Sequence, residues 1–311
     1  MAQKIIDTTT PQPNGKIGDT AKVAFGKIND NFTELFNSLN GKAAATHTHE
    51  IAKITGLQAA LDGKAAATHT HGIADVSGLQ AALRGYIDGL RMEWVSGTSL
   101  RVTGGAAYVP GLNGILGVES PITKSGLSLA ANTWYHLYLY RNGGSADIEI
   151  SATDPAAPYS GAARTKTGDS TRRYIGSIRT VASGEVARFR HNLPGSILYS
   201  ANINLFRVLA NGTKANPPAN ISLTDAIPVT SRVARVVVEN GGTNAGTVAF
   251  SNPDLTTTDV GAAILFFLRS TGMAEADLPT SEGRQINYAY LSPPAAGVGA
   301  SVWVVGYSFE R

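Results

Sequence analysis

Two His-Thr-His triplets carry the side chains in this sequence that are best suited to chemistry. His47 pairs with His49 and His69 with His71, and these four are most of the chain's six histidines. Side chains at positions i and i+2 of an extended segment point the same way, so each triplet should present two imidazoles together. Neutral imidazole is a ligand for iron, zinc, nickel and copper. The alternative is a pair of surface histidines in a polar linker.

Each triplet lies in a 22-residue block that occurs twice in tandem. Residues 41–62 and 63–84 agree at 17 of 22 positions. A unit this short cannot bury its own apolar face and has to pack against other copies. One chain offers two copies, so the block predicts that several chains assemble.

Three parallel chains would bring six imidazoles to one point, which suits octahedral coordination of a divalent metal. Six nitrogen ligands disfavour tetrahedral zinc and leave no open position, so such a metal would be structural. Its binding energy would favour assembly of the trimer. One site per ring of triplets gives about two metal ions per trimer. A competing hypothesis is a metal-dependent enzyme, which predicts an open coordination position and fewer than three chains.

The elements that must position the triplets begin with a polar arm and a helix. Residues 1–15 are polar and rich in turn residues, and we expect an extended arm. We expect a helix over 19–40, with Asp19 as N-cap and Gly41 as C-cap. Its heptad-spaced apolar residues are Ala21, Phe25, Ile28, Phe32, Leu35 and Leu39. This stripe predicts a parallel helical coiled coil between chains; the alternative is an amphipathic helix packed on a globular core.

The tandem repeats should form a thin stalk over residues 41–90. Each repeat predicts one short helix, at 56–61 and at 78–83, with Thr55 and Ser77 as N-caps. So few apolar residues in each repeat cannot build a wide core.

The hydrophobic pattern changes to period two from about residue 95, which predicts β-strands. The clearest strand is 134–141, followed by a turn at Asn142 and Gly143. In the last strand, Trp303 and Tyr307 should share one face. We therefore expect a mainly β fold. The arm and helix would occupy residues 1–40, and the stalk would follow them. Two antiparallel modules of the β-sandwich or jelly-roll type would come next, over 91–200 and 201–311. Three such chains would form an elongated parallel homotrimer.

Two groups of side chains in the first β module are candidates for binding a receptor. One is an aromatic row on the strand 134–141, which would stack on sugar rings or pack between sheets. The other is a run of basic residues over 164–190, which would meet phosphate groups of a glycolipid or form a solvated strand face. The resulting candidates are Trp134, Tyr138, Tyr140, Arg172 and Arg173.

Composition narrows the classes of function. The chain has no cysteine, so no disulfide or thiolate metal site is expected. A net charge of +3 does not predict a nucleic-acid partner. The sequence contains neither a signal-type apolar segment nor a membrane-length apolar run, so we expect no membrane insertion. None of the usual hydrolase, P-loop or metalloprotease motifs is present, and we expect a protein that is not an enzyme.

The quoted segments resemble bacteriophage tail fibres and receptor-binding proteins. The stretch GDTAKVAFGKINDNFTELF is similar to the start of many such fibres, and the THTH-containing units are similar to their shaft repeats. The segments TWYHLYLY, STRRYIGSIRT and VWVVGYSFER are similar to fibre modules. In that family, HxH motifs of three parallel chains bind iron on the trimer axis. The resemblance thus implies that His47, His49, His69 and His71 bind iron.

The resemblance also implies a location in the virion, in a protein made in the host cytoplasm. The N-terminus would attach to a baseplate or tail-tip protein, and the distal modules would bind a host receptor. Polysaccharide, lipopolysaccharide, a pilus and an outer-membrane protein stay open as receptors. Long fibres place many HxH motifs near the tip, whereas this chain has two near its N-terminus. The open alternatives are a structural baseplate or tail-tip component and a fibre of a phage-tail-like bacteriocin.

Overall fold

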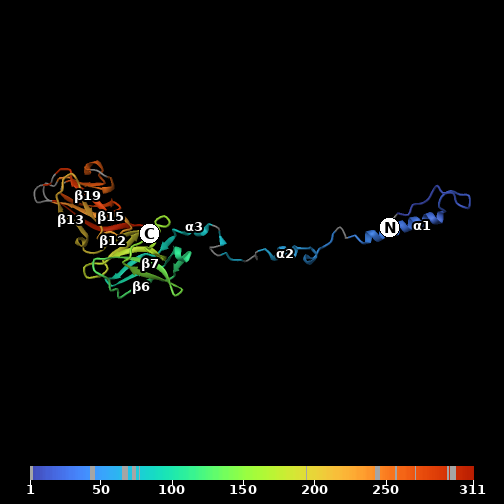
Figure 1. Cartoon of the computed structure of the whole chain (residues 1–311), viewed down its shortest axis with the longest axis horizontal. Helices are drawn as coiled ribbons and strands as arrows, with labels where there is room; N and C mark the ends of the chain where they lie inside the picture. The colour runs from blue at the N-terminus through green and yellow to red at the C-terminus, as the bar shows by residue number, and fades with distance from the viewer. Residues whose placement is uncertain are drawn as a thin grey trace. The chain divides into compact units, whose positions relative to one another are not determined.

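A computed structural model of the chain describes residues 3–42, 46–64, 69–71, 75–76, 78–193, 195–241, 246–255, 258–269, 271–292, 294 and 299–311. The chain divides into two compact units, Met1–Thr70 and His71–Arg311. The fold is mainly β, as predicted, and its strand ladders are antiparallel (Figure 1). No helix within the described residues has the length and apolar character needed to cross a membrane.

The first unit contains the predicted helix, α1, over Ala21–Asn40. The prediction of Asp19 as N-cap is wrong, because Thr20 occupies that position without a side-chain cap. The Asp19 carboxylate instead accepts hydrogen bonds from the Asp7 amide at 2.7 Å and from the Lys27 ammonium at 2.6 Å. Gly41 is the C-cap, as predicted, and its N–H donates to the Asn37 carbonyl at 3.2 Å.

The N-terminal arm folds back along α1. An antiparallel bridge between Pro11 and Ile17 turns the chain. Gly18 has a φ of +78°, and a Cβ there would lie 2.6 Å from the Asp7 carbonyl oxygen. Only glycine fits such a conformation at so close an approach.

The two repeats contain matching short helices, α2 over Leu57–Asp62 and α3 over Leu79–Leu83. A 3₁₀ helix, η1, precedes α2 over Ile51–Lys53. The N-caps of α2 and α3 are Gly56 and Gly78, both left-handed, with φ of +82° and +79°. Thr55 is therefore not the N-cap, contrary to prediction, and the predicted cap Ser77 lies outside the described residues.

Two smaller sheets belong to the first part of the second unit. The first has the order β1 (Ile87–Gly89), β4 (Gly105–Val109), β5 (Gly114–Val118). The second has the order β8 (Ser145–Ser151), β7 (Trp134–Asn142), β10 (Asp169–Arg179), β9 (Thr165–Lys166). A 3₁₀ helix, η3, covers Pro110–Leu112.

A large sheet and a further small one complete the second unit. The large sheet runs in the order β18 (Gly272–Pro279), β15 (Ser231–Asn240), β20 (Ala300–Phe309), β12 (Ser196–Tyr199), β11 (Phe189–Leu193), β2 (Met92–Ser96), β3 (Ser99–Val102), β6 (Ile122–Lys124), with β13 (Arg207–Gly212) beside β20. The small one runs β14 (Ala219–Ser222), β19 (Gln285–Tyr290), β16 (Val248–Ser251), β17 (Phe266–Leu268). Three 3₁₀ helices are η4 (Ile203–Phe206), η5 (Pro253–Leu255) and η6 (Val260–Ala262).

The large sheet crosses the module boundary that we predicted near residue 200. Strand β20 pairs with β15 and also with β12, which precedes the boundary. One hydrophobic cluster likewise runs from Leu90 to Phe309. Strands from both sides of residue 200 therefore share a sheet and a core.

The predicted strand at 134–141 is β7, and both of its faces are packed. Leu137 and Leu139 are buried on one face, and His136 and Tyr138 on the other. Gly143, with a φ of +54°, follows the strand in the predicted turn.

The pairing of β20 corrects the prediction that Trp303 and Tyr307 share a face. Trp303 pairs with Val237, whereas Tyr307 pairs with Ala234. Val237 and Ala234 are three residues apart on β15 and so lie on opposite faces. A bulge in β20 between these pairs reverses the alternation, which places Trp303 and Tyr307 on opposite faces.

Candidate functional site

The first histidine triplet brings its two imidazoles together, as the i, i+2 spacing predicts. The Nε2 atoms of His47 and His49 lie 2.9 Å apart. Their ring centroids are 4.6 Å apart and the ring planes cross at 77°. Both residues are exposed, so the paired nitrogens can meet a metal ion or another chain.

The separation of these nitrogens is that of a hydrogen bond in which one ring donates its N–H and the other accepts. Ligation of one metal ion by both Nε2 atoms would replace this hydrogen bond, because each nitrogen would then direct its lone pair at the ion. The spacing brings two imidazoles together and does not by itself select a coordination geometry.

The second triplet is described over residues 69–71. His69 and His71 are both exposed, and the boundary between the two compact units falls after Thr70, within this triplet. Their sequence context matches that of His47 and His49, since six residues precede each triplet identically in the two repeats.

The heptad stripe of α1 is largely open to solvent within its own unit. Phe25 is 64% exposed, Phe32 55% and Leu39 61%. Such large apolar side chains on one helix face are typical of a contact surface.

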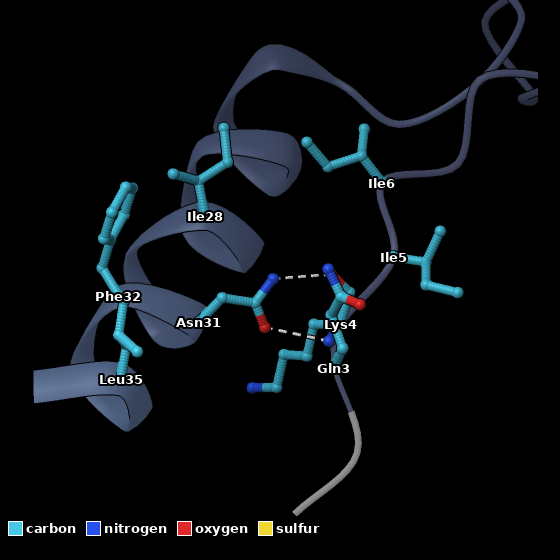
Figure 2. A pocket seen from close by; sticks show the side chains of 8 residues that line it. All are labelled: Gln3, Lys4, Ile5, Ile6, Ile28, Asn31, Phe32 and Leu35. Atoms are coloured by element: carbon cyan, nitrogen blue, oxygen red, sulfur yellow. Dashed lines mark hydrogen bonds between the residues drawn. The ribbon is translucent and has the colours of Figure 1, made fainter. Parts of the chain in front are cut away.

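The arm and α1 enclose a groove of about 400 Å³, shown in Figure 2. The Asn31 amide pairs with the backbone of Lys4: it accepts from the Lys4 N–H at 2.9 Å and donates to the Lys4 carbonyl at 2.8 Å. The Lys4 ammonium also lies 2.6 Å from Asp30. These contacts hold the arm beside the apolar side chains of Ile28 and Phe32, which line the groove.

The candidate receptor residues of the second unit are mostly packed inside it. Tyr138 and Arg173 are fully buried, so neither can touch a ligand on the surface. Trp134 is half-buried and donates its indole N–H to the Thr224 carbonyl at 2.8 Å. Arg172 stacks on the Tyr140 ring at 4.3 Å and binds Glu149 at 2.8 Å. The burial of Tyr138 and the contacts of Trp134 and Tyr140 support the packing interpretation of the aromatic row.

The basic residues of 164–190 do not form a single patch. Arg164 binds Glu310 at 3.3 Å, and Arg179 binds Asp225 at 3.0 Å. Lys166 pairs with Glu149. Arg188 and Arg190 are exposed on or beside β11.

The structure also contains a hydrogen-bonded chain that sequence reasoning missed. The His136 ring lies 2.8 Å from Ser177 Oγ through Nδ1 and 2.9 Å from Asp154 Oδ1 through Nε2. Ser177 is 1% exposed, and its hydroxyl also contacts the Tyr174 hydroxyl at 2.8 Å. A nucleophile has to reach its substrate, so this buried serine has a packing role. No local motif signals the chain, because β7 and β10 bring its members together.

Residues 22–85 match the family model described as Phage tail repeat like. This match supports a phage tail protein. The matched range contains nearly all of α1, both triplets and the helices α2 and α3. No curated protein matches the chain.

Proposed function

We propose that this protein is a phage tail fibre or receptor-binding protein that attaches the virion to its bacterial host. The observation that carries the proposal is the phage tail repeat match over residues 22–85. The arm and α1 would join the baseplate or tail tip, and the β-rich second unit would meet the host surface. The protein would act by adhesion and not by catalysis.

The assembly that we propose is a parallel homotrimer. Its support is the exposed apolar stripe of α1, which needs partner helices to be buried. Short tandem repeats, which need neighbouring copies, support it as well. Three equivalent binding units on one assembly would gain avidity from weak single contacts.

Each ring of triplets in the trimer would hold one structural metal ion, with about two ions per trimer. His47 and His49 would be ligands in one ring, and His69 and His71 in the other. The convergence of the first pair supports ligation of a shared ion by both rings, and iron is our choice from the family resemblance. The metal would link the three chains, while the imidazole pairs orient its coordination.

Two related functions would use the same parts. A structural baseplate component would position other fibres and would not bind cells. A fibre of a phage-tail-like bacteriocin would bind cells but belong to a particle without a genome. The tail repeat is compatible with both alternatives. A measurement of cell binding separates the baseplate component from the fibre that we propose.

The test is adsorption of the labelled full-length protein to a panel of bacterial strains that includes the strain carrying or propagating the phage. We expect saturable binding to that strain, and we expect excess unlabelled protein to slow virion adsorption. Deletion of 201–311 is not a suitable variant, because it would remove β20 from the centre of the large sheet. Absence of saturable binding to any strain would instead favour the baseplate component.

A further inference from the structure

A polar groove of about 490 Å³ lies on the second unit where β2 meets β11. The groove exists because two strands separate there. Among the described residues β11 and β2 pair at one position, Arg190 with Glu93, whereas β2 and β3 pair at four. The lining residues used below are Arg91, Glu93, Trp94, Arg101, Arg190 and His191.

The groove carries an excess of positive charge. Its three lining arginines face one lining carboxylate, that of Glu93, which already binds Arg101 at 2.5 Å. Arg190 is exposed, and no ion pair links it to a carboxylate among the described residues. An exposed guanidinium without a carboxylate partner is suited to bind a carboxylate or phosphate through two parallel hydrogen bonds.

Arg91 and His191, which also line the groove, hold it in shape. Arg91 donates to the carbonyls of His191 and Asn192 at 3.0 and 2.8 Å. The His191 Nδ1 atom accepts the Met92 amide at 3.0 Å, so in the neutral ring the proton lies on Nε2. His191 is 8% exposed, and its Nε2 has no hydrogen-bond partner in the described part of the chain. Such a buried donor without a partner costs stability unless another group accepts from it.

An aromatic ring stands beside these cations. Trp94 is half-buried, and its indole N–H donates to the Val186 carbonyl at 3.1 Å, which fixes the ring. The Arg188 guanidinium lies 5.1 Å from the ring centroid and is otherwise exposed. The ring packs against the core and carries the Arg188 guanidinium over one face, so it positions this cation, and its exposed part can contact a sugar whose acidic substituent meets the arginines.

We infer that the groove between β2 and β11 binds an anionic sugar, one that carries a phosphate or a carboxylate. Arg188 and Arg190 would bind the anionic group, and Trp94 would contact the sugar ring. This inference rests on the proposed role in host attachment and specifies the chemistry of the receptor. A nucleic acid also offers phosphates, but a net charge of +3 favours a sugar, as does the burial of Phe189, which leaves Trp94 as the lining Phe, Tyr or Trp side chain that is partly exposed.

The test is saturation-transfer NMR on the full-length protein with four probes: glucose 6-phosphate, glucuronate, glucose and a short single-stranded DNA. The groove variant is Arg188→Gln with Arg190→Gln. The matched control is Arg141→Gln with Arg207→Gln, two exposed arginines on other strands, which removes the same charge.

We expect saturation transfer to at least one of the two charged sugars and weak or no transfer to glucose. The groove variant should weaken binding by about tenfold, whereas the control should change it by less than about twofold. Transfer to glucose 6-phosphate but not to glucuronate would identify the anion as phosphate, and the reverse as carboxylate.

Equal binding by the groove variant, binding of glucose as strong as that of the charged sugars, or binding of DNA alone would each overturn the inference. So would the absence of any transfer. The measurement contains no cells, so protein that adsorbs to bacteria but binds neither charged sugar would leave the attachment function intact and remove this site.

Discussion

His191 is a buried histidine of β11 that combines a packing role with a titratable ring. Burial lowers its pKa, and the nearby Arg311 and Arg91 add to the shift, which brings the pKa to about 4. Burial also lowers the pKa of His136, against the opposing effect of Asp154. Both rings are therefore favoured in the neutral form in the folded unit.

This depressed pKa makes stability depend on pH. In the unfolded chain His191 takes up a proton below its ordinary pKa of 6.5, whereas the folded chain resists protonation until about pH 4. The contribution of the neutral His191 ring to the free energy of unfolding is thus complete above pH 6.5 and is lost as the pH falls toward 4. Between pH 7 and pH 5 we expect His191 to account for a loss of about 2 kcal/mol in the free energy of unfolding.

Urea unfolding of His191→Asn at the two pH values checks this expectation. The asparagine Oδ1 can still accept the Met92 amide, so the variant removes the titration while keeping an acceptor. We expect the pH-dependent loss to shrink by about 2 kcal/mol relative to the wild type. An unchanged pH dependence would show that His191 does not titrate in this way.

At the scale of the elements, α1 is a helix whose apolar stripe is largely exposed among the described residues of its unit, although the arm lies beside part of it. Leu35 is 53% exposed, so its replacement should hardly affect the folding of a single chain. In a helical bundle the same side chain would be buried, and a carboxylate in its place would lose its hydration at a large cost in free energy. We expect Leu35→Asp to dissociate the assembly, or to lower its thermal midpoint, while circular dichroism of the β-rich unit stays the same.

Asn37→Asp is the matched control for this substitution. It adds the same charge to an exposed position of α1 outside the heptad stripe. Light scattering of both variants gives the comparison. Retention of the full assembly by Leu35→Asp would remove α1 from the interface.

Local pattern was enough to predict some of these elements from sequence. The heptad spacing predicted α1, and β-forming residues before Asn142 and Gly143 predicted β7. The N-cap was missed because Asp19 bonds to Asp7 and Lys27, which are 12 and 8 residues away. The bulge of β20 was missed because it depends on pairing with β15, far along the chain.

The candidate site shows the same division between local and distant information. The convergence of His47 and His49 follows from i, i+2 spacing alone. The burial of Arg173 does not follow from local spacing, because its guanidinium donates to the carbonyls of Arg164 and Tyr174 inside the packed sheet. The charged groove joins Arg91 to a segment 100 residues later, so no sequence window contains both sides of it.

At the scale of the whole molecule, the proposed function needs several chains acting together. The exposed stripe of α1 and the short repeats support such an assembly. The large sheet of the second unit is built within one chain, from strands on both sides of residue 200. Assembly is therefore expected to depend on the first 90 residues, and the second unit should fold without it.

Native mass spectrometry of the full-length protein tests the trimer with metal rings most directly. One chain has a mass of 32.4 kDa, and we predict a particle of about 97 kDa that holds two metal ions. His47→Ala with His49→Ala should remove one of the two ions, because it empties one ring, and should lower the thermal midpoint of the assembly. A monomer or dimer, or a double variant that keeps the full metal content, would contradict the account.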